Sequence, residues 1–254
     1  LGIDSINNSY DPAMKQMRLK QLQDHNCFEF HNIDILDQSS LMQFSEVALD
    51  GIIHLAARAG VRQSVLDPHT YMSTNVIGTL NLLELCRTNN TKKFILASTS
   101  SLYGETNSNI ILESDPTDSP LTPYSASKKS AELLCYAYHH QYGIDISINR
   151  YFTVYGMLGR PDMSIFKFIK LINNDDAITI FGNGEQTRDF THVNDVAAGT
   201  IKSLIPVGYQ IFNLGSNNPV SVNHVIHLIE KKLGKFAIKT YISRNSADVT
   251  STHA

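Results

Sequence analysis

The sequence predicts an α/β fold built on a doubly wound parallel sheet. Short apolar runs alternate with longer segments of helical periodicity, which is the pattern of repeated βαβ units. With 254 residues, of which 42% are hydrophobic and 18% charged, the chain can bury a core of ordinary size. Polar or small residues directly follow several apolar runs, as expected where parallel strands end at a ligand site.

The predicted elements follow one another in βα order. We expect the end of a strand at residues 1–4 and further strands at 27–33, 51–55, 93–98, 144–151, 178–181 and 210–214. Helices are expected at 14–23, 39–48, 71–89, 124–142, 165–173 and 193–204. A last helix should begin after the N-cap Ser221 and end at Gly234, with an apolar face made of Val222, Val225, Ile226 and Ile229.

The composition excludes several classes of function. A net charge of −3 and a pI near 6.4 leave no basic field for nucleic acid. Cys27, Cys86 and Cys135 are isolated, which predicts reduced thiols in a cytoplasmic protein rather than disulfides or a zinc site, and we expect no metal. No apolar run reaches the roughly 18 residues that cross a membrane. The chain begins at Leu1 rather than Met, so we expect an N-terminal piece to be absent.

The strongest catalytic signal is Tyr124-Ser125-Ala126-Ser127-Lys128. On a helix, Tyr124 and Lys128 lie one turn apart on the same face. A phenol has a pKa of about 10, and a neighbouring ammonium lowers that pKa by stabilising the phenolate. The pair is therefore a candidate general base. About half such a match is expected by chance in this chain, so the surrounding motifs decide.

Candidate ligand residues follow the predicted strands. Asp4 can accept both hydroxyls of an adenosine ribose, and Asp34-Ile35 can border an adenine ring, although turn or cap roles fit these residues equally well. The small residues of Ala56-Ala57-Arg58-Ala59-Gly60 permit close approach of a bulky ligand, or simply tight packing. Thr99-Ser100-Ser101 supplies hydroxyl donors and acceptors, or forms a Ser/Thr turn.

Together these segments resemble the extended short-chain dehydrogenase/reductases, and within them the sugar-nucleotide epimerases that act on UDP-glucuronate. The resemblance runs over essentially the whole chain. Its segments are Asp4, His54-Leu55-Ala56-Ala57, Asn75-Val76-Ile77-Gly78-Thr79, Ala97 to Gly104, Tyr124 to Lys128, Arg150 to Gly156, Gly159-Arg160-Pro161-Asp162-Met163, and Phe181-Gly182 to Arg188-Asp189-Phe190-Thr191. One departure is large, because the family's first strand and its Gly-rich turn, which holds the cofactor pyrophosphate, lie outside this sequence.

The resemblance implies an NAD-binding Rossmann-type domain at residues 1–155, incomplete at its N-terminus. It also implies a smaller, interwoven lobe at 156–254 that binds a UDP-sugar, with parts near 192–215 returning to the first domain. The cofactor implied is NAD. Its contacts are implied for Asp4, Asp34, Ile35, Leu55, Ala56, Ala57, Asn75, Ser98, Tyr124, Lys128, Tyr151 and Phe152.

The implied reaction is 4-epimerisation through a 4-keto sugar. Tyr124 would take the proton of the 4-hydroxyl, Lys128 would lower the Tyr124 pKa, and Thr99 would hydrogen-bond the same oxygen. Sugar-nucleotide 4,6-dehydratases carry Asp-Glu where this chain has Ser100-Ser101, which argues against dehydration. Ser101 also argues against UDP-glucuronate decarboxylation. The resemblance thus implies conversion of UDP-glucuronate to UDP-galacturonate for cell-surface polysaccharide.

Substrate contacts are implied for Thr99, Ser100, Ser101, Thr153, Arg160, Phe181, Arg188 and Arg62. Arg160 offers a planar cationic fork to a C6 carboxylate, or else forms a surface ion pair with Asp162. Arg188 would meet the diphosphate and Phe181 the uracil, whereas a solvated role suits Arg62 as well. Two other functions stay open. One is 4-epimerisation of UDP-glucose or UDP-N-acetylglucosamine, and the other is a catalytically silent Rossmann-type binding protein.

Relatives of this kind dimerise through the helix that carries the catalytic tyrosine and the helix before it. The corresponding segments are 71–89 and 124–142, so the resemblance implies a homodimer. Leu82, Leu85, Leu133 and Tyr136 would supply the apolar faces of that contact, unless they are buried within one chain.

Overall fold

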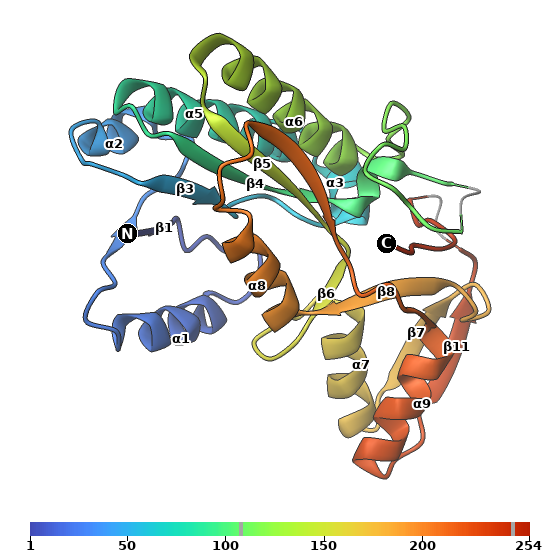
Figure 1. Ribbon diagram of the computed structural model, residues 1–254. Helices are drawn as coiled ribbons and strands as arrows, with labels where there is room; N and C mark the ends of the chain where they lie inside the picture. The colour runs from blue at the N-terminus through green and yellow to red at the C-terminus, as the bar shows by residue number, and fades with distance from the viewer. Residues whose placement is uncertain (107–108, 245–246) are drawn as a thin grey trace. The chain divides into compact units, whose positions relative to one another are not determined.

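The computed structural model describes residues 1–106, 109–244 and 247–254, and the chain divides into two compact units (Figure 1). Unit one comprises Leu1–Ser98, Thr122–Asn149 and Lys202–Ile211. Unit two comprises Thr99–Leu121, Arg150–Ile201 and Phe212–Ala254. Neither unit is one continuous stretch of sequence, because the chain leaves and re-enters each of them.

Parallel strands form the centre of unit one. β1 (Gly2–Asp4) pairs in parallel with β2 (Phe30–Asn32), and β3 (Gly51–His54) pairs in parallel with β4 (Lys93–Thr99). The larger sheet continues through β5 (Asp145–Tyr151) to β9 (Tyr209–Leu214), in the order β3-β4-β5-β9. The predicted α/β fold with a parallel sheet is confirmed. In the described residues the strands of unit one form two separate sheets.

The helices of unit one lie near predicted ones with two differences: the helix Val61–Leu66 was not predicted, and the helix expected at 39–48 ends earlier, at Phe44. They are α1 (Pro12–Gln23), α2 (Gln38–Leu41) with a 3-10 turn at Met42–Phe44, α3 (Val61–Leu66), α4 (Pro68–Met72), α5 (Gly78–Thr88) and α6 (Pro123–Tyr142). A π-helical turn, Ser73–Ile77, joins α4 to α5, so the single helix predicted for 71–89 is wrong in detail. The Thr122 hydroxyl accepts the Ser125 N–H and caps α6, which ends at the left-handed Gly143.

The core of unit one lies between the sheet and the pair α5 and α6, which run side by side over β4 and β5 (Figure 1). α5 contributes Leu82, Leu83 and Cys86, and α6 contributes Ala131 and Cys135. Leu82 and Leu85, expected either at an assembly face or inside the chain, are buried within the chain. Leu133 and Tyr136 on α6 are exposed.

Unit two contains two small sheets. β8 (Thr187–His192) lies between β6 (Thr153–Tyr155), to which it is parallel, and β10 (Pro219–Ser221), to which it is antiparallel. β7 (Ala177–Phe181) pairs in parallel with β11 (Ile238–Ile242). None of β6, β8, β10 and β11 was predicted.

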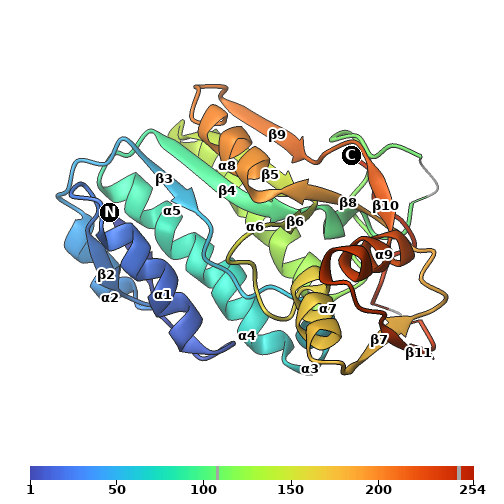
Figure 2. The ribbon, with the colours of Figure 1, turned by 90° about the horizontal axis from the view of Figure 1, so that it is seen from below.

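Three longer helices complete the described fold: α7 (Ser164–Asn173), α8 (Val193–Lys202) and α9 (Val222–Leu233). The predicted limits of α9 are confirmed, because the Ser221 hydroxyl accepts the His224 N–H and Gly234 ends the helix in the left-handed conformation. α7 and α9 pack together (Figure 2), and Val225, Ile226 and Ile229 of α9 lie in their shared core. No helix of the described residues is long and apolar enough to span a membrane.

Candidate active site

The first turns of α6 carry the tyrosine and lysine that the sequence singles out. Tyr124 is half-buried, and its ring makes an edge-to-face contact with Tyr71, with ring centroids 6.1 Å apart. The Tyr71 hydroxyl in turn donates to the carbonyl of Ala59 at 3.0 Å. Tyr71 of α4, fixed by the loop that follows β3, therefore holds the Tyr124 ring from one side.

Lys128 is buried on the same helix, with 2% of its surface exposed. Burial lowers the pKa of Lys128 to about 8, against the opposing influence of Cys135 and Glu132. Among the described residues, no hydrogen bond or ion pair engages its Nζ atom. Glu132, one turn further on, accepts a hydrogen bond from the Ser98 hydroxyl at 2.5 Å. A buried ammonium without its own partner is suited to meet the polar groups of a ligand.

Asn75 joins the loop after β3 to the catalytic helix. Its Oδ1 atom accepts the Arg58 N–H at 2.8 Å, and its Nδ2 atom donates to the Arg58 carbonyl and to the Ser127 hydroxyl, each at 2.9 Å. The Ser127 hydroxyl donates to the Tyr124 carbonyl at 2.7 Å. Both Nδ2 hydrogens are thus used inside the protein. Asn75 sits on the π-helical turn, which directs its side chain to this position.

His54 is a site residue to which the sequence analysis gave no role. Its Nε2 atom lies 3.0 Å from the Thr79 hydroxyl, which donates to the Asn75 carbonyl, so His54 is the donor to Thr79. Its buried Nδ1 atom has no partner in the described residues. Burial, with a smaller contribution from the Lys128 charge, lowers the pKa of His54 to about 3. The neutral histidine thus holds the Thr79 hydroxyl, which in turn holds the backbone carbonyl of Asn75. The available signal was a histidine ending an apolar strand.

The residues proposed to contact the adenosine end of NAD differ in their burial and in the contacts that they make. Asp4 and Asp34 each use Oδ1 to accept a backbone N–H two residues later, as turn aspartates do. Ile35 is buried in the core, where a Cβ on Gly78 would come within 2.4 Å of its Cδ1 atom. This contact requires a glycine at 78. Leu55 and Ala57 are exposed, whereas Ala56 packs against the core.

In unit two, the hydroxyl cluster forms a short capped turn. Thr99 accepts the Ser101 N–H through its hydroxyl at 3.1 Å and donates to the Ser101 hydroxyl at 3.1 Å. This bond caps a 3-10 turn at Ser100–Tyr103. The structure therefore brings Thr99 and Ser101 together, and we call Thr99–Ser101 the hydroxyl turn.

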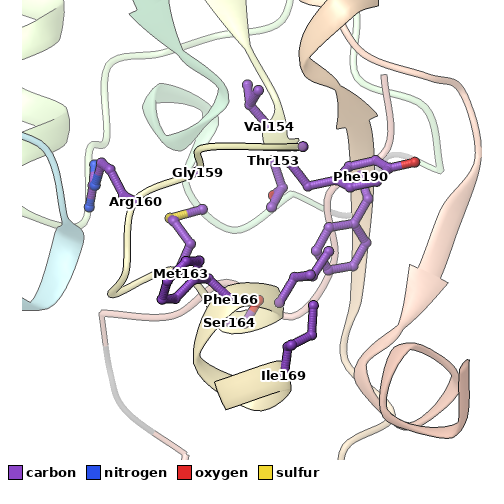
Figure 3. Close-up of a pocket in the computed structure, with 12 residues that line it drawn as sticks. Thr153, Val154, Gly159, Arg160, Met163, Ser164, Phe166, Ile169 and Phe190 are labelled. Carbon is purple, nitrogen blue, oxygen red and sulfur yellow. The ribbon is translucent and has the colours of Figure 1, made fainter. Parts of the chain in front are cut away.

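A cavity of about 80 Å³ in unit two is lined by two further candidates, Thr153 and Arg160 (Figure 3). Most of the remaining lining is apolar and comes from β6, β8 and α7, including Phe190, Phe166 and Ile169. Arg160 lies at the edge of this group in Figure 3. Its guanidinium makes a two-point ion pair with Asp162, with Nη2 to Oδ2 at 2.5 Å and Nε to Oδ1 at 3.0 Å.

The other candidates of unit two make mainly internal contacts. Arg188 donates to the carbonyls of Thr187, Val249 and Thr250. The Tyr151 hydroxyl lies 2.8 Å from the Thr200 hydroxyl, and the buried Phe152 packs with Tyr103. Phe181 ends β7, and its carbonyl accepts a hydrogen bond from Gln186.

Arg62, in unit one, is exposed on α3. In the part of the chain that the structure describes, no group of three or more His, Cys, Asp or Glu side chains could hold a metal ion.

Comparisons with known proteins give one consistent result. Residues 5–215 match the model of the NAD dependent epimerase/dehydratase family. The chain is 50% identical to a UDP-glucuronate 4-epimerase of Thermodesulfobacterium geofontis, over 100% of this chain and 79% of the relative.

Two solved structures are also similar. The chain superposes on a Bacillus cereus UDP-glucuronic acid 4-epimerase in complex with UDP-glucuronic acid and NAD, with a TM-score of 0.92, 38% identity and coverage of 100% and 81%. A UDP-N-acetylglucosamine 4-epimerase from Methanobrevibacter ruminantium gives a TM-score of 0.88 with 30% identity, over 99% of this chain and 80% of that one. The chain therefore belongs to the NAD dependent epimerase/dehydratase family.

Proposed function

We propose that the chain catalyses the NAD-dependent 4-epimerisation of UDP-glucuronate to UDP-galacturonate, which supplies cell-surface polysaccharide synthesis. The observation that carries this proposal is the pairing of half-buried Tyr124 with buried Lys128 on α6, where the lysine Nζ has no partner of its own. The names of the similar proteins support the choice of substrate.

The residues fit NAD at two places. The Oδ2 atom of Asp4, at the carboxyl end of β1, lies outside the aspartate turn and would accept the adenosine ribose hydroxyls, and Asp34 follows the paired strand two residues after Asn32, the partner of Asp4. The buried Lys128 ammonium would hold the hydroxyls of the second ribose. Leu55, Ala56, Ala57, Ser98, Tyr151 and Phe152 would border the cofactor. Bound NAD+ would supply the hydride acceptor for oxidation at sugar C4, and its reduced form would supply the hydride donor for reduction from the other face.

Tyr124 is the proposed general base and acid. Its phenolate takes the proton of the sugar 4-hydroxyl, and the phenol gives that proton back when the carbonyl is reduced. The Lys128 charge stabilises the phenolate, and the Thr99 hydroxyl would turn its one hydrogen from the Ser101 hydroxyl to the same sugar oxygen. Asn75 and Ser127 fix the backbone of Tyr124, because their hydrogen bonds end on its carbonyl.

Substrate choice is assigned to unit two. Ser100 and Ser101 supply neutral donors to the C6 carboxylate, Thr153 adds a third, and Arg160 adds a charged fork from the wall of the cavity. Arg188 is proposed to meet the diphosphate and Phe181 the uracil, and Arg62 of unit one is a further candidate ligand of the substrate. A uronate matches this set of donors better than a neutral hexose does.

We further propose that the enzyme works as a cytoplasmic homodimer, with its NAD-binding domain at 1–155 and its UDP-sugar lobe at 156–254. Free thiols at the buried Cys86 and Cys135 suit a reducing compartment. The exposed Leu133 and Tyr136 of α6 offer an apolar face for a second copy.

The test is an assay of the full-length protein with NAD+ and, in separate reactions, UDP-glucuronate, UDP-glucose and UDP-N-acetylglucosamine. We expect UDP-galacturonate from the first substrate and much slower turnover of the other two. Tyr124→Phe should lower turnover by at least about a hundredfold with little change in UDP-sugar affinity, as expected when a general base is lost. The matched control is Tyr136→Phe, at an exposed position of the same helix. Near-normal turnover by Tyr124→Phe would exclude Tyr124 as the base.

A further inference from the structure

The hydroxyl turn Thr99–Ser101 needs an anchor beyond its own hydrogen bonds. The bonds between Thr99 and Ser101 fix these two residues against each other, but they do not fix the turn against the rest of unit two. The 3-10 turn ends two residues later at Tyr103, and Gly104 then reverses the chain with a φ of +63°. A Cβ at Gly104 would also lie 3.0 Å from the Ser119 carbonyl oxygen. The turn is therefore short, and Tyr103 is its far end.

Tyr103 is held by two buried hydrogen bonds. Its hydroxyl donates to Oδ1 of Asn213 at 2.7 Å and accepts from Nη1 of Arg150 at 2.8 Å. The Arg150 guanidinium also lies 4.9 Å from the centroid of the Tyr103 ring, within the range of a cation–π contact. Burial raises the pKa of Tyr103 despite the opposing hydrogen bond from Arg150, so the hydroxyl stays protonated and remains a donor. Only 7% of Tyr103 and 2% of Arg150 is exposed.

Asn213 connects this anchor to the segment at 111–113 through two further hydrogen bonds. Asn213 donates through Nδ2 to the Ile111 carbonyl at 3.0 Å and through its backbone N–H to Oε1 of Glu113 at 2.8 Å. Arg150 reaches the Glu113 carbonyl as well. Arg150 of β5 and Asn213 of β9 therefore meet at the Tyr103 hydroxyl, and both are bonded to the segment at 111–113. The tyrosine links them to the hydroxyl turn.

The chemistry of the proposed substrate gives this anchor a specific task. Oxidation of C4 makes a β-keto acid, because the C6 carboxylate is attached to C5. If the C5–C6 bond aligns with the carbonyl π system, it breaks, its electron pair enters the enolate of the ketone, CO2 leaves, and a proton adds at C5. Reduction at C4 then yields a UDP-pentose, so this side reaction has the same redox balance as epimerisation. Donors that keep the carboxylate from rotating suppress it.

We infer that Tyr103, Arg150 and Asn213 are positioning residues that hold the hydroxyl turn in place, so that Ser100 and Ser101 keep the C6 carboxylate from rotating while C4 is a ketone. This inference rests on the proposed function. It predicts that loosening the anchor changes what the enzyme makes, in addition to how fast it works. Tyr103 touches neither the substrate nor the cofactor in this scheme.

The test is the molar ratio of UDP-pentose to UDP-galacturonate formed by the full-length protein from UDP-glucuronate and NAD+, measured by anion-exchange chromatography. Tyr103→Phe keeps the ring and removes both hydrogen bonds of the hydroxyl, whereas Asn213→Ala removes the acceptor of Tyr103 together with the Nδ2 donor to the Ile111 carbonyl. Each should raise the ratio about tenfold, the factor that corresponds to the loss of one or two hydrogen bonds of ordinary net strength. The matched control is Tyr138→Phe, which removes the hydroxyl that donates to Glu84 at 2.5 Å in unit one. Its ratio should equal that of the unaltered protein.

An unchanged ratio in both variants, with only a lower melting temperature or turnover, would overturn the inference and leave the network a structural one. If Tyr103→Phe does not fold, the ratio given by Asn213→Ala decides. The ratio is independent of how much enzyme is folded, which separates positioning from stability. If the unaltered protein forms no UDP-galacturonate, the proposed function fails before the anchor is tested.

Discussion

Arg160 is the residue at which the substrate proposal can be tested most directly. Arg160 lies at the edge of the cavity of unit two, and its guanidinium is paired with Asp162. If the fork also meets a C6 carboxylate, Arg160→Leu should cost roughly 2–4 kcal/mol of transition-state binding for UDP-glucuronate, because a charge-assisted contact is lost. Any UDP-glucose turnover should fall far less. The measurement is kcat/KM for both substrates.

Asp162→Asn is the control for Arg160, since it weakens the ion pair but leaves the guanidinium. If the ion pair between Arg160 and Asp162 has only a structural role, both variants should lose the same fraction of kcat/KM for both substrates. A uronate contact predicts a large loss only for Arg160→Leu with UDP-glucuronate. Equal losses would leave the uronate assignment to family similarity alone.

His54 gives a prediction about pH. The folded state holds the pKa of this histidine at about 3, while an unfolded histidine titrates near 6.5. The unfolded chain therefore binds more protons, so the stability from neutral His54 is complete above about pH 6.5 and is lost as the pH falls toward 3. The slope from this group is about 1.4 kcal/mol per pH unit. Urea unfolding at several pH values measures it.

The comparison for His54 is the variant His54→Leu, whose stability should depend less on pH between about 6.5 and 4. His140→Leu, at an exposed position of α6, should keep the full dependence. If His54→Leu has the same pH slope as the unaltered protein, His54 is not the group responsible. The orphan Nδ1 atom makes leucine a tolerable replacement on that side of the ring, whereas the bond to Thr79 is lost.

At the scale of elements, α6 carries both the proposed base, Tyr124, and the proposed contact between copies. Leu133 and Tyr136 are more than half exposed, in contrast to Leu82 and Leu85 of α5. Leu133→Glu should halve the mass measured by light scattering at micromolar concentration, because a charge is placed in an apolar contact. Leu228→Glu on α9, where the leucine is also exposed, should leave the mass unchanged. A strictly monomeric unaltered protein would contradict the dimer.

The elements that the sequence predicted are those with a clear period or a cap. α6 and α9 have both, and the apolar runs of β3, β4 and β5 are bounded by turn residues. The strands that were not predicted show little alternation of apolar and polar residues in the sequence. β6 and β10 have three residues each, which is too short to show alternation, and β8 is largely polar, so it shows no apolar period.

The site was predictable only where chemistry follows a strand or repeats on a helix face. The spacing of Tyr124 and Lys128 predicted their common helix, and the hydroxyls of Thr99–Ser101 were expected after β4. The supporting contacts could not be predicted, because Asn75 meets Arg58 and Ser127 at separations of 17 and 52 residues. Tyr103 and Asn213 are 110 residues apart. Such pairs depend on the fold, and no local pattern encodes them.

At the scale of the molecule, a buried ionic network stabilises unit one. The Lys93 ammonium is paired with Asp145 and also donates to the Ser147 hydroxyl at 2.9 Å and the Ile205 carbonyl at 3.1 Å. Asp145 in turn accepts two backbone N–H groups from the segment at 207–208. The network thus joins β4 and β5 to the connection that leads into β9.

Lys93→Met should lower the free energy of unfolding by about 3–5 kcal/mol, because it leaves a partly buried carboxylate without its counter-ion. The measurement is urea unfolding at neutral pH. Lys92→Met, next to it in sequence but exposed and bonded only locally to Asn90, should change stability by less than about 0.5 kcal/mol. A small effect of Lys93→Met would mean that water or a neighbouring group replaces the ammonium.

The separation of the strands of unit one into two sheets has a consequence for handling the protein. β3 stands at the end of its sheet and β1 has β2 as its single neighbour among the described strands, so each presents an open row of backbone N–H and C=O groups. Beside the β3 edge, Ile53 and Leu55 are 41% and 59% exposed. An open, apolar strand edge is a template on which another chain can add a strand. A charged residue at position 53 should therefore oppose pairing of β3 with a strand of another chain.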